Sequence, residues 1–253
     1  MRYSECPAEA PLDRLVDAFW TLTSDGRPPP RDAGAILPDG AVEIVLVCRG
    51  RVTAPPSRAP LRRFVLGPSD RVRRLKYRGA IALAGVRLLP TAAAQLLDTS
   101  VPSIADRIVP LATVLPDLDR ELRSAVVSLD SALERLGRVF ASHAGTDSSV
   151  NPLLERAAAE IRRRHGRIRI GDLARTLGVS QRQLERRFLA GIGLSPKRWC
   201  RIVRFQSALR AMSSGRAWVD LAHDLGYADQ AHFSREFREF SGEPPSAAAW
   251  MRG

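Results

Sequence analysis

The chain has 253 residues and 45% of them are hydrophobic, which excludes a disordered chain and favours two domains, each with an ordinary core. Its net charge of +12 is uneven, because residues 1–150 carry 20 basic and 17 acidic residues whereas residues 151–253 carry 19 and 10. The basic second part is typical of a protein that binds a polyanion.

The N-terminal residues MRYSECPAEAPLDRL lack the basic start and the apolar run of a signal peptide. The most apolar region is interrupted by Arg87 and Pro90, so it predicts no membrane span. Cys6, Cys48 and Cys200 show neither pairing nor metal-ligand spacing, which suits a reducing compartment. We therefore expect a cytoplasmic protein without a membrane partner or a cofactor.

Residues 1–145 predict an α+β domain, in which a small antiparallel sheet or partial barrel is combined with helices. The apolar residues from Leu12 to Trp20 have helical spacing, although FWTLT could equally extend as a strand. The segment ILPDGAVEIVLVCRGRVTA predicts a turn at PDG, a buried strand, a tight turn near Arg49–Gly50 and a returning strand. Further strands are expected at RFVLG and over residues 71–86, and a short helix at TAAAQLL.

Residues 117–142 predict a helix with a single apolar stripe. The stripe consists of Leu118, Leu122, Val126, Leu129, Leu133, Leu136 and Phe140. Such a stripe can pack on its own domain or form a dimer seam, and both alternatives stay open here. Asn151 and Pro152 then suit the start of another helix. We therefore expect the domain boundary at 145–151 and a second, all-α domain over 151–253.

The stretch LARTLGVSQRQLERRF predicts a helix, a tight turn and a second helix. Gly178 suits the turn, and Ser180 suits the N-cap of the second helix. Leu184 and Phe188 then face inward at positions i and i+4. The outward face presents amide, guanidinium and carboxylate groups, which suit base edges in the DNA major groove.

Further along, LAHDLGYADQAHFSREF repeats this pattern with one more residue in the turn. Ala222 and Gly226 take the same relative places as in the first copy, and Asp229 suits an N-cap. Phe233 and Phe237 face inward. One copy of this pattern is a weak signal, but two copies in a basic segment indicate a domain with two helix-turn-helix units.

Between the copies, residues Ser195 to Met212 predict a connecting helix, SPKRWCRIVRFQSALRAM, with Trp199, Val203 and Leu209 facing inward. Eighteen helical residues span roughly 27 Å at about 1.5 Å each. This length is close to the ~34 Å between successive major-groove faces on one side of B-DNA. The spacing predicts that one monomer places two reading helices in adjacent grooves.

The second domain resembles the DNA-binding domain of the AraC/XylS family of transcription regulators. The resemblance rests on LARTLGVSQRQLERRF, on GLSPKRW with Arg204 and Ala208 downstream, and on DLAHDLGYADQAHFSREFREFSGEPP. It covers about residues 151–250, and its one departure is Ala248, which stands where the family usually has an aromatic, with Trp250 the nearest one. The resemblance implies sequence-specific binding to double-stranded promoter DNA and contact with RNA polymerase.

Residue by residue, the resemblance and the outward faces imply two sets of DNA contacts. The base contacts would be Gln181, Arg182, Glu185, Arg186, Gln230, Ala231, His232, Ser234 and Arg235. The phosphate contacts would be Ser180, Arg198, Arg201 and Arg238. Arg186 and Arg235 suit guanine, and Gln230 suits adenine. Glu185 suits cytosine N4 or a pair with an arginine of its own helix, and His232 either contacts a base or faces solvent.

In this family the first domain usually binds an effector, dimerises or does both, so a small-molecule effector and a homodimer are expected partners. FW, LPDG followed by EIV, and GVRLLP–TAAAQLL resemble an N-terminal domain found in a subset of these regulators. Trp20, Phe64 and Tyr77 could line an apolar effector pocket or belong to a core. The run RVRRLKYR could attract an anion or form a solvated strand face.

Two other functions stay open as alternatives. An architectural protein would bind DNA without sequence preference and would not need Gln or Glu on the outward faces. A DNA alkyl-transfer repair protein, to which a domain of this kind is also fused, would need clustered cysteines. The three cysteines cannot supply such a cluster, and the four histidines His143, His165, His223 and His232 show no metal spacing. We therefore expect no enzymatic activity.

Overall fold

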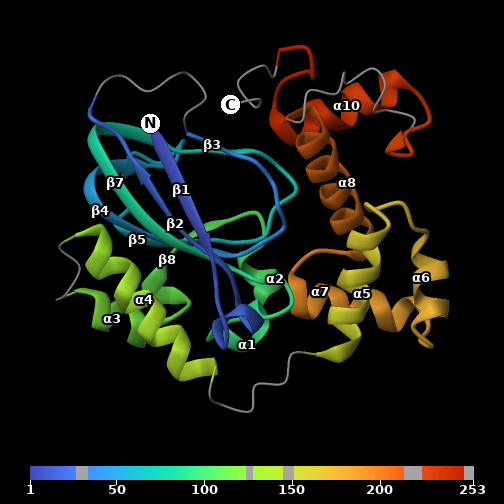
Figure 1. Ribbon diagram of the computed structural model, residues 1–253, viewed down its shortest axis with the longest axis horizontal. Coiled ribbons are helices and arrows are strands. Elements are labelled where there is room, and N and C mark those ends of the chain that lie inside the picture. The colour runs from blue at the N-terminus through green and yellow to red at the C-terminus, as the bar shows by residue number, and fades with distance from the viewer. Residues whose placement is uncertain (27–33, 124–127, 145–150, 214–223, 248–253) are drawn as a thin grey trace.

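The structure is a computed structural model that describes residues 1–26, 34–123, 128–144, 151–213 and 224–247 (Figure 1). The first half forms a six-stranded antiparallel sheet in the order β1-β2-β7-β4-β5-β8. Its strands are β1 (Arg2–Pro7), β2 (Val16–Thr23), β4 (Glu43–Thr53), β5 (Arg63–Leu66), β7 (Lys76–Leu88) and β8 (Ile108–Pro110). A second, two-stranded sheet pairs β3 (Ala35–Ile36) with β6 (Arg73–Arg74).

The first part of β4 is buried on both faces of the sheet, which explains its nearly continuous apolar run. Ile44 and Leu46 belong to the core cluster on one face, whereas Val45 between them belongs to the cluster on the other. The first face is covered by helices, and these are α1 (Ala93–Leu96), α2 (Val101–Ile104), η2 (Leu111–Thr113), α3 (Pro116–Arg123) and α4 (Leu129–Ala144). The predicted α+β class of the first domain is confirmed.

The helix predicted between Leu12 and Trp20 is wrong, and the strand alternative is correct. A short 3-10 helix, η1 (Leu12–Arg14), precedes β2, in which Val16, Ala18 and Trp20 are buried and Asp17 is exposed. The apolar spacing in this segment fits a helix and a strand equally well. Pairing with β7 decides between them, because it satisfies the backbone groups of β2 along its length.

The tight turn predicted near Arg49–Gly50 is also wrong. β4 runs on to Thr53, and β7 pairs with it from Glu43 to Thr53 with register shifts on either side of Arg49. Gly50 has a φ of +87°, so the glycine accommodates a bulge rather than a reversal. The strands predicted at RFVLG and over 71–86 correspond to β5 and to β6 with β7, and TAAAQLL contains α1.

The helix predicted over residues 117–142 is two helices, α3 and α4, and residues 124–127 between them, including Val126, lie outside the described part. Four members of the predicted stripe, Leu118, Leu122, Leu136 and Phe140, are buried in the core of their own domain. Packing on the own domain is therefore the correct alternative for these four residues, and they form no exposed dimer seam.

The second half is helical and has one core, in agreement with the predicted all-α domain. Its described helices are α5 (Pro152–Arg163), α6 (Ile170–Thr176), α7 (Gln181–Ile192), α8 (Pro196–Ser213) and α10 (Gln230–Ser241). The Asn151 side chain accepts a hydrogen bond from the Leu153 amide at 3.1 Å and caps α5, as predicted. Residues 145–150 are not described, so the boundary at 145–151 stays a prediction. Among the described helices, none combines the length and the apolar character needed to cross a bilayer.

The two domains are in contact along α8. The Gln206 side chain donates a hydrogen bond to the carbonyl of Pro38 at 2.6 Å. The Trp199 indole packs so closely on Gly40 that a Cβ added at Gly40 would lie 2.7 Å from Nε1. The same indole is the edge-to-face neighbour of Phe188 on α7, with ring centroids 5.6 Å apart. One tryptophan thus belongs to the helical core and to the contact with the first domain.

Candidate DNA-binding interface

The first helix-turn-helix unit consists of α6 and α7, as predicted. Gly178 between them has a φ of +70°, a conformation that glycine adopts at little cost. Ser180 caps α7 by accepting from the Gln183 amide at 3.2 Å, and the Gln183 side chain accepts in return from the Ser180 amide at 3.0 Å. Leu184 and Phe188 are fully buried. The cap and these two buried side chains fix which face of α7 is exposed.

The exposed face of α7 carries all four base-contacting residues predicted for this helix: Gln181, Arg182, Glu185 and Arg186. The Gln181 amide donates to the Glu185 carboxylate at 2.8 Å, so Glu185 pairs with a glutamine and not with an arginine of its helix. Neither Arg182 nor Arg186 forms an ion pair within the described residues. Leu189, which the sequence did not single out, lies one turn further along and is 46% exposed. Its signal was the spacing i, i+4, i+7 formed by Arg182, Arg186 and Leu189.

α10 is the corresponding helix of the second unit. Gly226 has a φ of +74°, and the Asp229 side chain caps α10 by accepting from the His232 amide at 2.6 Å. Phe233 and Phe237 are fully buried, as predicted. The preceding helix of this unit, including the predicted packing residue Ala222, lies outside the described residues, as do Ala248 and Trp250.

The predicted base contacts on α10 differ in their exposure. Gln230, Ala231 and Arg235 are exposed, and Ser234 is half-buried. His232 is also half-buried, because its ring packs edge-on against Tyr227 with centroids 5.3 Å apart. Gln230, Ala231 and Arg235 are therefore the more accessible positions on this helix.

α8 connects the two units and stands between α7 and α10 (Figure 1). Glu236 on α10 is 5% exposed and bonds to two arginines of α8, Arg201 at 2.8 Å and Arg204 at 3.1 Å. Arg201 also pairs with Glu239 and stacks on the Phe240 ring at 5.0 Å. This network fixes α10 against α8, and its only sign in the sequence was a carboxylate on the inner face of α10.

The four predicted phosphate contacts lie in different surroundings. Ser180 is exposed while it caps α7, and Arg238 is exposed without an ion pair to any described residue. Arg201 is bonded to Glu236 and Glu239, so its guanidinium is not free for a phosphate in this structure. Arg198 is occupied as well, but by carboxylates of the first domain.

Arg198 joins α8 to the first domain through two carboxylates. It donates to both Asp70 oxygens at 2.6 and 2.7 Å and to Asp106 at 2.8 Å. Hydrogen bonds from Arg198 lower the pKa of Asp70, so the pair is charged at neutral pH. A bidentate carboxylate presents oxygens much as a phosphate does. Asp70 and Asp106 therefore occupy the guanidinium that the sequence assigned to a DNA phosphate.

A cavity of about 480 Å³ lies where the second face of the sheet meets α8. Trp20 and Tyr77 line it, whereas Phe64, predicted as a third lining residue, is fully buried and does not. Gln206 and Leu209 of α8 close one side. A ligand in this cavity would touch both domains.

The polar end of the cavity contains one arginine surrounded by carboxylates. Arg87 lies within 3.0–3.5 Å of Glu5, Asp17, Asp39 and Glu43. Burial, and then the neighbouring Asp39, raises the pKa of Glu43 to about 7 even though Arg87 donates to it at 3.0 Å. These residues were not predicted, because they come from four strands and a loop and meet only in the folded chain.

The cysteines lie apart, on β1, β4 and α8. Burial raises the pKa of Cys200 to about 12 and also raises that of Cys48, so neither thiol is a ready nucleophile at neutral pH. Within the described ranges, no group of three or more His, Cys, Asp or Glu side chains could hold a metal ion.

Comparison with known families divides the chain as its fold does. Residues 173–249 match the family described as a helix-turn-helix domain, and residues 4–110 match one described as a domain of unknown function (DUF6597). A putative AraC-like transcription regulator of Streptomyces lividans is 34% identical over 77 residues, which are 30% of this chain and 25% of that protein. The HTH-type transcriptional regulator GbdR of Pseudomonas aeruginosa (strain UCBPP-PA14) is 35% identical over 81 residues, 31% of this chain and 22% of that protein. The match thus spans about a quarter of the length of each relative.

ToxT from Vibrio cholerae has the same fold over nearly the whole chain. The two structures agree with a TM-score of 0.52 over 92% of this chain and 98% of ToxT, at 12% identity. The fold and the family match together define a protein with an N-terminal sheet domain and a helical domain of the helix-turn-helix class. The family match and these relatives identify the second domain as a helix-turn-helix domain of the AraC type, in agreement with the resemblance seen in the sequence.

Proposed function

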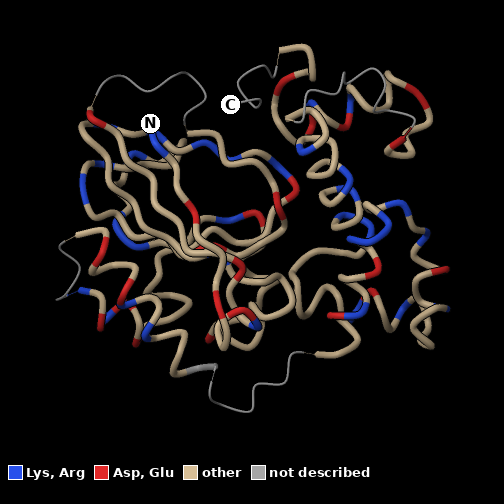
Figure 2. Tube along the Cα trace, viewed as in Figure 1, with Lys and Arg blue, Asp and Glu red and all other residues tan. Residues whose placement is uncertain are grey.

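We propose that the chain binds promoter DNA sequence-specifically, with α7 and α10 in two adjacent segments of the major groove. The observation that carries this proposal is the pair of exposed helix faces, α7 with Arg182 and Arg186 and α10 with Gln230 and Arg235, on one connecting helix. α8 has 18 residues, which correspond to about 27 Å at about 1.5 Å per residue. Lys and Arg positions recur along this helix (Figure 2), which supports a polyanionic partner.

Selection of bound duplexes from a random library with the full-length chain tests the proposal. We expect an enriched site with two conserved segments about one helical turn apart, each read by one helix. The symmetry of the site reports the number of protomers, and therefore tests the expected homodimer. A library that shows no enrichment contradicts sequence-specific binding.

The rival function, an architectural DNA-binding protein, makes a different prediction for a salt titration. Binding through phosphates alone gives equal affinity for the selected and a scrambled duplex at every salt concentration. Specific reading gives an affinity ratio that persists as salt rises, since base contacts release no counterions. The glutamate on the exposed face of α7 favours specific reading, because a carboxylate is repelled by phosphate.

The cavity beside α8 supports modulation by a small-molecule effector. Its walls include Trp20 and Tyr77 from the sheet and Leu209 and Gln206 from α8, the helix that spaces the two reading helices. An amphipathic compound bound there would stabilise the chain according to its concentration and dissociation constant. A thermal-shift screen of such compounds should find ones that raise the Tm of the wild type more than that of Gln206→Ala. Equal shifts for both chains would place the bound compound elsewhere.

Transcription control then follows from how DNA is bound, and RNA polymerase is the expected partner at the promoter. In-vitro transcription from a promoter that carries the selected site tests this step. A changed transcript level with the wild type, but not with a chain that cannot bind the site, is the expected result.

A further inference from the structure

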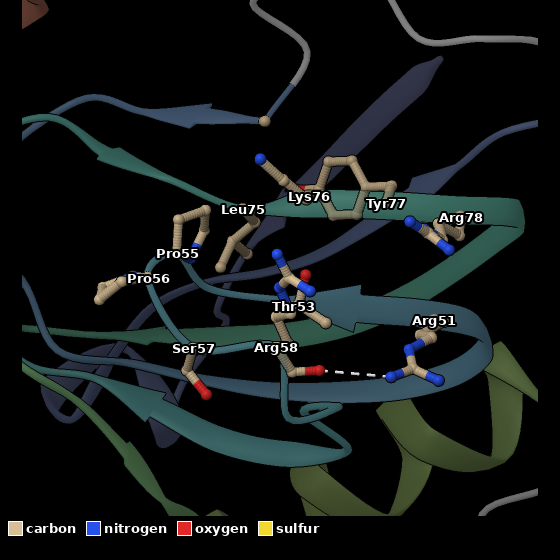
Figure 3. A pocket seen from close by; sticks show the side chains of 11 residues that line it. Arg51, Thr53, Pro55, Pro56, Ser57, Arg58, Leu75, Lys76, Tyr77 and Arg78 are labelled. Carbon is tan, nitrogen blue, oxygen red and sulfur yellow. Dashed lines mark hydrogen bonds between the residues drawn. The ribbon is translucent and has the colours of Figure 1, made fainter.

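A second concave surface of the first domain takes no part in the proposed function. It is a groove of about 870 Å³ between the end of β4, the loop of residues 55–58 and the start of β7 (Figure 3). All the lining residues that the structure describes come from the first domain. The groove includes Lys76, Tyr77 and Arg78 of the run RVRRLKYR, whose charge the interface between α7, α8 and α10 leaves unexplained.

Among the described residues that line this groove, none is a carboxylate and four are cations: Arg51, Arg58, Lys76 and Arg78. All four are exposed, and none forms an ion pair with a described residue. In this respect they differ from Arg63 of the same sheet, which pairs with Asp119 at 2.6 Å. Cations that converge without a counter-charge repel one another, and a bound anion relieves that repulsion.

The arrangement of the four cations is suited to a small ligand. Arg51 donates to the carbonyl of Arg58 at 3.3 Å, which ties the loop to the strand. Figure 3 shows Arg58 extending from its loop into the groove toward Tyr77, with Arg51 and Arg78 together at one end. Guanidinium groups bind phosphate oxygens in pairs of parallel hydrogen bonds, so this end suits a phosphate group.

The floor of the groove is apolar, and hydroxyl groups lie beside it. Leu75 is 6% exposed, and burial raises the pKa of Tyr77 to about 12, so its phenol carries no negative charge at neutral pH. Thr53 and Ser57 add hydroxyl donors. The Tyr77 ring offers a face on which a planar or apolar part of a ligand can lie.

We propose that this groove binds a small organic phosphate, with the phosphate groups on the four cations and the organic part on Tyr77. Duplex DNA is the competing occupant. The position of the described lining residues, all in the first domain, favours a small molecule, since the helices with base-reading faces belong to the other domain. The site is separate from the effector cavity, although Leu75 and Tyr77 border both, so the two ligands share a wall.

Isothermal titration calorimetry of the full chain tests the proposal with three probes: adenosine triphosphate, pyrophosphate and adenosine. We expect saturable binding, with affinity that decreases from adenosine triphosphate to pyrophosphate to adenosine. Arg51→Ala combined with Arg78→Ala should weaken binding of both phosphate probes at least about tenfold. Arg14→Ala removes an exposed, unpaired arginine of the same domain outside the groove and should leave both affinities within about twofold.

A second variant separates the two parts of the groove. Tyr77→Leu keeps an apolar side chain on the floor of the groove but removes the aromatic ring. It should lower the affinity for adenosine triphosphate and leave the affinity for pyrophosphate unchanged. Circular dichroism spectra that match the wild type show that each variant is folded. The proposal is overturned if neither phosphate probe binds saturably or if the double variant binds them as well as Arg14→Ala does. It is equally overturned if the double variant loses affinity for duplex DNA and none for the probes.

Discussion

Arg186 is the side chain whose replacement separates a base contact from a phosphate contact. It is exposed on α7 and forms no ion pair with a described residue, so its removal leaves no buried charge behind. We expect Arg186→Ala to lower affinity for the selected site by about 1–3 kcal/mol and to relax the preference at one base pair. Fluorescence anisotropy with single-base variants of the site measures both effects.

The matched control for Arg186 is Arg175→Ala, which removes an exposed arginine of α6 that pairs with Asp172 at 3.1 Å. This control should change affinity little and leave the base preference intact. A uniform loss of affinity across all duplexes with Arg186→Ala means that the guanidinium touches phosphate alone, and contradicts a base-reading role.

Glu43 predicts a pH dependence of folding. Its pKa rises from 4.5 to about 7 on folding, so between these pH values the folded chain holds a proton that the unfolded chain has lost. The stability linked to this group is fully present below pH 4.5 and is lost as pH rises through about 7. Glu43→Gln should therefore flatten this part of the pH profile in urea denaturation. Glu9→Gln, an exposed glutamate of the same domain, is the control, and an unchanged profile with Glu43→Gln would refute the assignment.

Among the elements, the pair formed by α8 and α10 depends on Glu236. Removal of its carboxylate leaves the half-buried Arg201 and Arg204 with one partner fewer. Loss of one partner of a buried ion pair lowers the free energy of unfolding by about 3 kcal/mol, because the remaining charge stays away from water. We expect Glu236→Ala to lower the free energy of unfolding by about this amount and to widen the spacing preference of the selected DNA site, because α10 is then less firmly held. Chemical denaturation and a repeated library selection measure the two effects.

Glu239→Ala is the control for Glu236, because Glu239 is 51% exposed and shares only Arg201. Exposed ion pairs contribute less than about 1 kcal/mol, so this variant should remain close to the wild type. If both variants lose the same stability, the buried network does not fix α10 and the explanation fails.

The helices of the second domain could be predicted because their signals are local. Caps at Ser180 and Asp229, the glycine turns and the buried pairs at i and i+4 each lie within one unit. β2 and β4 could not be predicted as reliably, since the choice between helix and strand, or between turn and bulge at Gly50, depends on pairing with β7 from far along the chain. Burial on both faces also removes the alternation that marks a strand.

For the candidate DNA-binding interface too, the features that depend on local sequence could be predicted and those that depend on distant contacts could not. Exposed side chains of α7 follow from the helical period and the cap, and the structure places all four of the predicted ones on the surface. Partners of Arg198, Arg201 and Glu43 are 35 to 128 residues away or come from other strands, so the sequence could not show that these charges are already occupied. The phosphate roles predicted for Arg198 and Arg201 therefore depend on contacts that must first break.

For the whole molecule, the contact between Arg198 and the first domain predicts control of DNA affinity. Asp70→Asn combined with Asp106→Asn removes both carboxylates that hold Arg198, and asparagine tolerates the positive φ of 59° at residue 106. We expect tighter binding to DNA and a slope of log affinity against log salt that is steeper by about one, since one more phosphate contact releases one more counterion. Anisotropy titrations at several salt concentrations measure the slope.

Asp98→Asn combined with Asp117→Asn changes the net charge equally at exposed positions and serves as the control. If the control steepens the slope as much as the test variant does, the effect is one of overall charge and Arg198 has no special part in it. An unchanged slope in the test variant would show that the freed guanidinium does not reach a phosphate.

Trp199 couples separation of the two domains to the packing of the helical core. Its indole rests on Gly40 of the sheet domain and on Phe188 beneath the first reading helix, so pulling the halves apart strips one wall from the helical core at the same moment. Intermediate separations would expose that wall to water without any compensating contact. We therefore expect an all-or-none transition, in which each molecule is either closed or open and a bound effector changes only the fraction of open molecules.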